Sequence, residues 1–225
     1  MVFWRYAMKI LAVIVVALNL LFCGTPSYGE TSFYQIDPNK SELVARLFRG
    51  GFAEFLGHNH VIRATEFSGS IQFDPENHSF FAAFIEVKTA SLKADEPEIR
   101  AKHKLEKKVR DKDRKKIQNT MESAEQLDVK KFPVMVFKAT KVEKQEKDQY
   151  RIHGDLTMHG VTRPVSLLMS AKTEKSQVAL QGSLKFKQSD FGIKPFSALF
   201  GGVKNKDEAI LIIDIVASLQ QSSAN

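Results

Sequence analysis

Several segments of this chain alternate apolar residues with a period of two, which is the pattern of β-strands that turn one face toward a core. Residues 150–158 place Tyr150, Ile152, Leu156 and Met158 on one face. The same alternation occurs in 67–73, 80–87, 165–169 and 178–186, and residues 209–219 are apolar on nearly both faces. The pattern predicts a protein built mainly from antiparallel strands.

Turn residues separate these segments at 37–39, 74–77 and 159–160, and the charged stretch 141–150 is expected to form the tip of a hairpin. Counting the segments gives roughly eight strands. A closed barrel of that size leaves an interior that side chains fill or that holds one small ligand.

Residues 95–127 interrupt the strand pattern. Pro97 suits the first turn of a helix, and Ile117, Met121 and Ala124 recur at helical spacing. Asp111 or Asp113 is expected to be the N-cap residue. The sequence therefore predicts a short α-helical insertion with a lysine-rich outer face.

The first 29 residues resemble an export signal, because a basic head precedes the apolar run 10–22 and small residues follow it. Cleavage is expected after Gly29, which leaves 30–225 as one domain located in the periplasm. Lipid attachment at Cys23 is disfavoured because Phe22 precedes it, whereas retention of the segment as an N-terminal anchor stays open. Cys23 is the single cysteine, so the domain has no disulfide.

The net charge of 30–225 is +5, and residues 93–116 alone have a net charge of +5. A nucleic-acid-binding protein would carry a broader basic surface, so that class is excluded. The basic segment favours a solvated helix face, and it also allows transient contact with a membrane surface.

His58 and His60 lie in the string "LGHNHVIR" and would project to the same face of a strand. One hypothesis is a metal site or a metal-dependent enzyme, although no third ligand stands at a telling spacing. The favoured interpretation places both histidines at the rim of the barrel. An acid–base pair of Asp155 and His159 is disfavoured, because no nucleophile or oxyanion arrangement accompanies them, and no catalytic residue is predicted.

Five strings resemble the YceI family of exported, lipocalin-like proteins associated with polyisoprenoid binding. They are "YQIDPNKSELVARL" (34–47), "FSGSIQFD" (67–74), "LDVKKFPVMVFKATKV" (127–142), "GDLTMHGVTRPVSL" (154–167) and "SDFGIKPFSALFGGVKNKDEAIL" (189–211). The resemblance runs from about Tyr34 to Ala217 and implies an eight-stranded antiparallel lipocalin-like barrel with a long apolar tunnel. The family's Arg-Asp-x-His-Leu string is matched only loosely by "IRAKHKLEKKVRDKDRKK" (99–116), and "GHNH" (57–60) belongs to one branch of the family.

The resemblance implies a binding protein that holds an apolar isoprenoid lipid, such as a polyprenyl lipid or a quinone tail, without catalysis and without a cofactor. The apolar stripes supply the residues expected to line the cavity: Phe67, Ile71, Phe73, Phe84, Phe137, Leu156, Met158 and Phe186. A structural or stress-response module with a self-filled core is another alternative. The resemblance also allows a homodimer, although no stretch of sequence marks an interface.

Overall fold

A computed structural model of the chain describes residues 32–74, 79–105, 107–174 and 176–220. The predicted signal peptide, residues 1–29, lies outside the described residues. All elements described below belong to one compact unit that spans 31–225.

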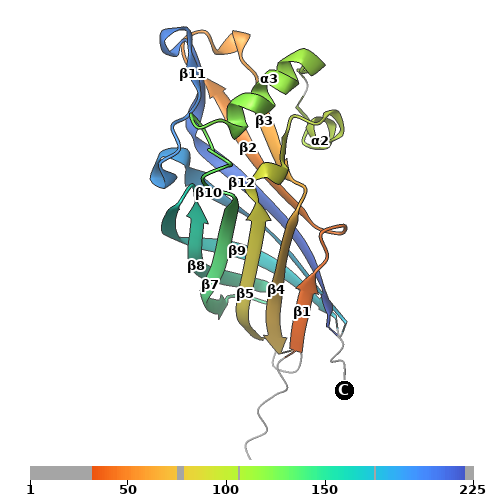
Figure 1. Cartoon of the computed structure of the whole chain (residues 1–225). Helices are drawn as coiled ribbons and strands as arrows, with labels where there is room; N and C mark the ends of the chain where they lie inside the picture. Colours follow the sequence, from red (N-terminus) through yellow and green to blue (C-terminus); the bar gives the residue numbers. More distant parts are fainter. Residues whose placement is uncertain (1–31, 75–78, 106, 175, 221–225) are drawn as a thin grey trace, which may run out of the picture. The chain divides into compact units, whose positions relative to one another are not determined.

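Eight strands form a closed antiparallel ring (Figure 1), and the pairing of β1 with β12 closes it. In ring order the strands are β1 Ser32–Ile36, β4 Phe67–Asp74, β5 Ser79–Lys88, β7 Val134–Lys144, β8 Gln149–Met158, β9 Val161–Glu174, β10 Gln177–Lys187 and β12 Val203–Leu219. The β7–β8 turn falls within the predicted hairpin tip. The predicted eight-stranded antiparallel barrel is therefore confirmed.

Three further strands extend the sheet from β12 beyond the ring, in the order β2, β3, β6. They are β2 Glu42–Gly50, β3 His60–Ala64 and β6 Leu92–Ala94, and the short β11 Ser197–Ala198 pairs with β12. Residues 37–41 separate β1 from β2, and both strands pair with β12 at different heights. The extension lies at the end of the barrel that also carries the helices (Figure 1).

The predicted helical insertion consists of α2 Pro97–Lys102 and α3 Asp111–Glu122, with Pro97 in the first turn of α2 as expected. The predicted N-cap is wrong: Arg110 occupies that position, and Asp111 and Asp113 lie in the first turn. Carboxylates there stabilise the helix through its dipole without capping it. Short 3-10 turns are η1 Glu54–Leu56, η2 Thr89–Ser91, η3 Gln188–Phe191 and η4 Leu199–Gly201. None of the helices in the described ranges has the length and apolar character to cross a membrane.

Helix α3 covers the sheet where β6 would otherwise present a free edge. The Gln118 amide nitrogen donates to the Leu92 carbonyl at 2.7 Å, and the Ala94 N–H donates to the Gln118 amide oxygen at 2.8 Å. The Gln118 side chain thus bonds to the edge of β6 as a neighbouring strand would. These bonds satisfy backbone groups that would otherwise be buried without a partner, at a cost in stability. Met121 on the same helix is buried against the barrel core.

An aromatic cluster closes the opposite end of the barrel. Phe80 packs against Phe73 at 4.7 Å and against Tyr150 at 4.6 Å between ring centroids, and Tyr34 meets Phe73 edge-on at 6.1 Å. All four side chains are buried. Edge-to-face rings pack densely, so this end is sealed and any internal space must lie toward α3.

Gly69 allows β4 and β5 to approach each other closely. A Cβ atom there would lie 2.2 Å from the Phe84 carbonyl oxygen and 2.9 Å from Ile36 Cδ1. We expect Gly69→Ala to lower the free energy of unfolding by about 1–3 kcal/mol, because backbone must shift to accept the methyl group. Urea unfolding would measure this change. Gly57→Ala is the matched control, since its nearest contacts would be 3.4 Å, and an equal loss in both variants would contradict the explanation.

Candidate functional site

The barrel encloses an apolar cavity between the aromatic cluster and α3. Its volume is about 210 Å³. The lining comprises Leu43, Ala45, Leu47, Ile62, Ala64, Ile71, Ala83, Ile85, Val87, Leu92, Met121, Gln126, Leu127, Met135, Val136, Phe137, Ile152, Leu156, Met158, Leu167, Met169, Leu180, Leu184, Phe186, Gln188, Ile193, Leu211, Ile213 and Ile215. None of these residues is charged.

Gln126 and Gln188 are the two polar residues of the lining, and both belong to segments near α3. The Gln188 amide nitrogen donates to the Lys206 carbonyl at 2.9 Å, and that of Gln126 donates to the Lys194 carbonyl at 3.0 Å. Backbone carbonyls only accept hydrogen bonds, so these contacts fix the amide orientation. Each amide nitrogen also donates to a second carbonyl, that of Gln188 to Asp207 at 3.4 Å and that of Gln126 to Glu125 at 3.0 Å. The polar group that each side chain has left to offer a ligand is therefore its acceptor oxygen.

The structure brings five of the eight predicted lining residues together around the cavity. They come from four different strands and are Ile71, Phe137, Leu156, Met158 and Phe186, with Leu156 and Met158 both on β8 and the others on β4, β7 and β10. Strand alternation placed them on the inner face, and barrel closure directed that face toward one space. Their contact with a ligand stays a prediction.

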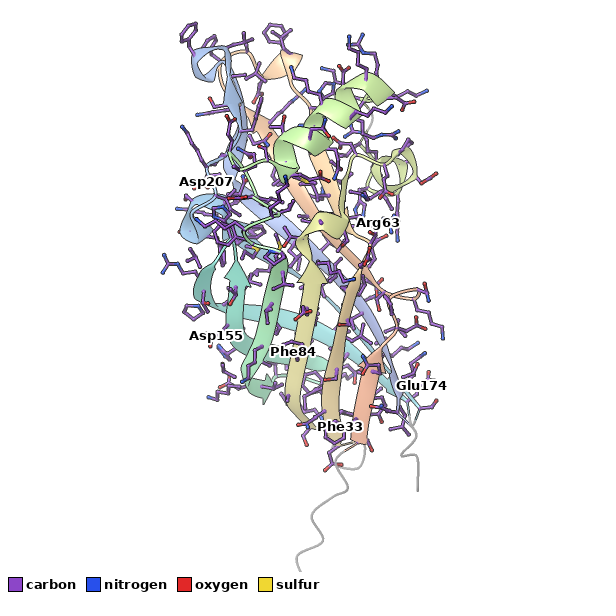
Figure 2. All side chains as sticks on the ribbon, in the orientation of Figure 1. Phe33, Arg63, Phe84, Asp155, Glu174 and Asp207 are labelled. Atoms are coloured by element: carbon purple, nitrogen blue, oxygen red, sulfur yellow. The ribbon has the colours of Figure 1, made fainter. Side chains whose placement is uncertain are left out.

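The prediction that Phe84 lines the cavity is wrong, because its side chain on β5 (Figure 2) is 39% exposed and absent from the lining. The inward residues of β5 are Ala83, Ile85 and Val87. A bulge explains the error: Gln72 pairs with Ala82, but Phe73 pairs with Phe80. The extra residue reverses the alternation, so a face counted onward from the buried Phe80 leads to the outside.

Phe67 and Phe73 are also absent from the lining, although both are buried inside the barrel. Phe73 belongs to the aromatic cluster that seals one end, and Phe67 is part of the packed core. Alternation assigns a residue to the inner face but gives no height along the barrel. The height decides whether an inner side chain packs against others or meets the cavity.

Sequence reasoning missed the lining residues that come from outside the regular strands. Gln126 and Leu127 follow α3, Gln188 is the first residue of η3, and Ile193 follows η3. The one signal for this region was the apolar face of the predicted helix, which includes the lining residue Met121. The loop residues carry no periodic pattern, so only the tertiary structure could bring them to the cavity.

His60 is held by a buried charge cluster rather than facing the cavity. Its Nδ1 lies 2.6 Å from Asp95 Oδ2, and Arg100 Nη1 lies 2.5 Å from Asp95 Oδ1. The same guanidinium donates to the Asn59 carbonyl at 2.8 Å, and the Val61 N–H donates to Asp95 Oδ1 at 3.2 Å. Asp95 and Arg100 are both buried. The cluster therefore fastens α2 to the beginning of β3.

Neither predicted rim histidine lines the cavity. The His58 and His60 rings lie 6.2 Å apart between centroids, and the hydrogen bond of His60 goes to Asp95 instead of to His58. Across the described ranges, no group of three or more His, Cys, Asp or Glu side chains is arranged to hold a metal ion. The geometry thus gives the metal hypothesis no third ligand.

Two pKa values in this region are lowered, for different reasons. Burial alone would raise the pKa of the Asp95 carboxyl, but the hydrogen bonds and positive charges of His60 and Arg100 outweigh it and hold that pKa below its usual value. Burial lowers the pKa of the His58 imidazole below its ordinary 6.5, and the charge of Lys107 lowers it further. The folded protein thus favours ionised Asp95 and neutral His58.

His58 should make stability depend on pH in the weakly acidic range. The unfolded chain binds a proton at His58 near pH 6.5, whereas the folded protein binds it only at lower pH, so stability is fully present above pH 6.5 and decreases as pH falls toward the lowered value. We expect the urea midpoint to decrease less steeply between pH 6.5 and 5 in His58→Gln than in the unsubstituted protein. Identical slopes in the two proteins would rule out this role.

Asp155 and His159 do not form an acid–base pair. Asp155 is exposed on β8 (Figure 2), whereas His159 has a φ of 50° in the β8–β9 turn and packs on Phe132 at 4.2 Å between ring centroids. The hydroxyls of Thr157 and Thr162 lie 2.8 Å apart across this turn. The stretch thus has the structural role that its turn residues suggested.

The sequence of this chain is similar to those of known proteins. A family model described as the YceI-like domain matches residues 34–217. A UPF0312 protein of Vibrio cholerae is 27% identical over 150 residues, which cover 64% of this chain and 70% of that protein. A UPF0312 protein of Shewanella baltica is 28% identical over 146 residues, covering 62% and 67%.

Solved structures agree at the level of the fold. The crystal structure of Burkholderia cenocepacia BcnA superimposes with a TM-score of 0.61 at 18% identity, over 81% of this chain and 99% of that one. The Campylobacter jejuni YceI protein gives a TM-score of 0.52 at 20% identity, over 71% and 85%. The family model spans most of the chain and the barrel agrees with these structures, so the chain belongs to the YceI-like family.

Proposed function

We propose that this protein is a periplasmic carrier that holds a long apolar lipid, of the polyisoprenoid or quinone type, in the barrel cavity without chemistry on it. The observation that carries the proposal is the uncharged cavity, in which all but two of the lining residues are apolar. The void also argues against the self-filled core, because side chains leave the middle of the barrel empty.

The energetics favour a long guest. Burial of hydrocarbon contributes about 0.8 kcal/mol per methylene, whereas association costs about 4–15 kcal/mol in lost freedom. Micromolar affinity needs a net of about 8 kcal/mol, so a guest must bury roughly 15–30 methylene equivalents. The cavity volume of about 210 Å³ lies below the usual range of about 300–1,000 Å³ for ligand sites, so the cavity suits a guest at the short end of this range of lengths.

The lining also bears on the polar end of the guest. A phosphate would enter a space without a cation, which is costly for a charged group. The acceptor oxygens of Gln126 and Gln188 suit a hydroxyl or another neutral donor at the α3 end of the cavity. The proposal therefore favours a prenyl alcohol or a quinol over a phosphorylated lipid.

Mass spectrometry of lipid extracted from the natively exported protein tests the proposal. We expect a neutral prenyl lipid to co-purify with the protein, near one molecule per chain. Metal analysis of the same sample addresses the alternative, for which stoichiometric metal lost in His58→Ala/His60→Ala would be required. Protein that carries no lipid and does not bind added prenol or quinone would contradict the carrier function.

A further inference from the structure

Two loops at the α3 end of the barrel expose an unusual number of large apolar side chains. The loop 51–57 follows β2 and the loop 196–202 precedes β12, and together they form the tip (Figure 1). Phe200 is fully exposed and Phe52 is 82% exposed. The tip residues that share this exposure are Phe52, Phe55, Leu56, Leu199 and Phe200. Contiguous exposed apolar residues on a water-facing surface mark an interaction site.

The two loops are fastened to each other through their backbones. The Ala53 N–H donates to the Gly202 carbonyl at 2.8 Å, and within the second loop the Gly202 N–H donates to the Leu199 carbonyl at 2.9 Å. Gly51 has a φ of 95°, and a Cβ atom there would lie 2.4 Å from the Gly202 carbonyl oxygen. A Cβ atom on Gly202 would lie 2.8 Å from Phe52 Cζ, so the Phe52 ring packs over the second loop. The apolar side chains of both loops nevertheless stay largely exposed.

Backbone strain in the second loop supports a binding role for the exposed apolar side chains. Leu199 and Phe200 are consecutive bulky residues with φ of 51° and 52°, in the left-handed region that such residues rarely adopt. Each bulky residue held in this region costs on the order of 1–3 kcal/mol. Strain of this kind is typical of sites whose geometry serves binding.

The surroundings of the tip are basic. Lys194, Lys204 and Lys206 lie beside the second loop and are exposed, and the α2–α3 segment 93–116 carries a net charge of +5. Lys107 connects this segment to the first loop, because its Nζ donates to the Phe55 carbonyl at 3.0 Å and to the Gly57 carbonyl at 3.2 Å. Exposed lysines of α3 such as Lys112 and Lys115 add to the same end of the barrel.

We propose that the tip docks onto anionic lipid bilayers, with the exposed apolar side chains of both loops inserted at the interface and the surrounding lysines on the headgroups. Apolar residues ringed by lysines match a surface that offers negative charge above hydrocarbon. A second copy of the chain would instead bring two basic ends together, which like-charge repulsion disfavours. The proposal concerns the outer surface and stands independently of what the cavity holds.

Hydrogen exchange of the full chain with phosphatidylcholine–phosphatidylglycerol vesicles tests this proposal, because it reads out each loop separately. We expect exchange to slow in peptides covering 50–57 and 196–203, and to stay unchanged in the β7–β8 turn at the opposite end (Figure 1). Pure phosphatidylcholine vesicles should slow it much less, and salt should weaken the effect.

Matched variants sharpen the test through vesicle co-sedimentation. Phe52→Ser/Phe200→Ser should weaken binding to anionic vesicles at least tenfold, because each buried phenylalanine contributes about that factor or more. Phe33→Ser is the control, since Phe33 is 50% exposed at the opposite end of the barrel (Figure 2), and it should change binding less than about twofold.

Two outcomes would overturn the proposal. Loop exchange that anionic vesicles leave unchanged would remove the docking surface itself. Exchange that slows with protein concentration in the absence of vesicles would assign the tip to contact between copies. Urea unfolding should show the same stability for the tip variant and the control, because both substitutions remove exposed side chains.

Discussion

Asp95→Ala is expected to lower the free energy of unfolding by about 3–5 kcal/mol, a large part of the roughly 5–15 kcal/mol that stabilises a typical domain. The carboxylate is buried and accepts hydrogen bonds from Arg100, His60 and the Val61 N–H. Its removal leaves the buried Arg100 guanidinium without its counter-charge. Equilibrium unfolding in urea at pH 7 measures the loss.

Two further variants separate this cause from a general defect. Asp113→Ala removes a carboxylate from an exposed pair with Arg110 and should lower the free energy of unfolding far less than Asp95→Ala does, because solvent screens an exposed pair. In Asp95→Ala/Arg100→Met both charges are gone, so the double variant should lose about 0.5–3 kcal/mol less than the sum of the two single losses. Additive losses would show that the buried pair is not the reason for the instability.

The Asp95 cluster also makes the stability of the protein depend on pH in the acidic range. The lowered pKa of Asp95 means that its stabilising effect is present above the ordinary value of 3.8 and is lost as pH falls through the lowered value in the folded state. The pH range in which Asp95 loses its stabilising effect therefore lies below the range expected for His58. Acid unfolding should therefore proceed in two ranges, of which the lower disappears in Asp95→Ala.

Ala83→Trp is expected to abolish lipid binding while leaving the barrel folded. Ala83 faces the cavity from β5 opposite Ile71, so an indole there would occupy space that the guest needs. Displacing about five methylene equivalents removes about 4 kcal/mol, which is roughly a thousandfold in Kd. Titration with a fluorescent prenyl or quinone analogue measures the affinity, and extraction of the purified variant should recover little lipid.

Ala82→Trp provides the control at the adjacent position. Ala82 pairs with Gln72 on the other face of the same strand and is not part of the lining. The two variants carry the same new side chain on the same strand, so only its direction differs. Equal affinity in both would show that the cavity is not the lipid site, whatever else the protein binds.

The α3 end of the barrel combines the features that a carrier of insoluble lipid needs. The cavity extends toward α3, where its lining passes from strands to the segments that contain Gln126 and Gln188. The apolar tip and the basic segment lie at the same end (Figure 1). We expect a lipid to enter and leave here, because the aromatic cluster fills the other end.

Much of the architecture could be predicted from local patterns. Alternation along 150–158 correctly placed Leu156 and Met158 inside the barrel, and Pro97 marked the start of α2. Phe84 shows where prediction from alternation fails: one bulge reversed the face, and nothing in the sequence signals that Phe81 is an extra residue between Phe80 and Ala82. Phe73 shows a second limit, because correct assignment to the inner face did not reveal that it seals the end.

The structure differs most from the sequence-based prediction in the charged segment 93–116. Asp95 and Arg100 belong to a run of charges that is typical of a solvated helix face, yet both are buried and hold His60 in place. Burial of an ion pair depends on partners from β3, which lies some 30 residues earlier in the chain. Neither the composition of the segment nor the spacing of its charges predicts that contact.

The sequence by itself determined the antiparallel strands, their turns and the helical insertion, because side-chain periodicity and turn residues act over a few neighbouring positions. Closure of the barrel depends on the pairing of β1 with β12, which are far apart in the chain. Only the tertiary structure decided how much of the interior stays empty, where the cavity ends and which charges are buried. These features arise from packing between residues that are distant in sequence. A single shift of register or of height along the barrel changes them without altering any local pattern.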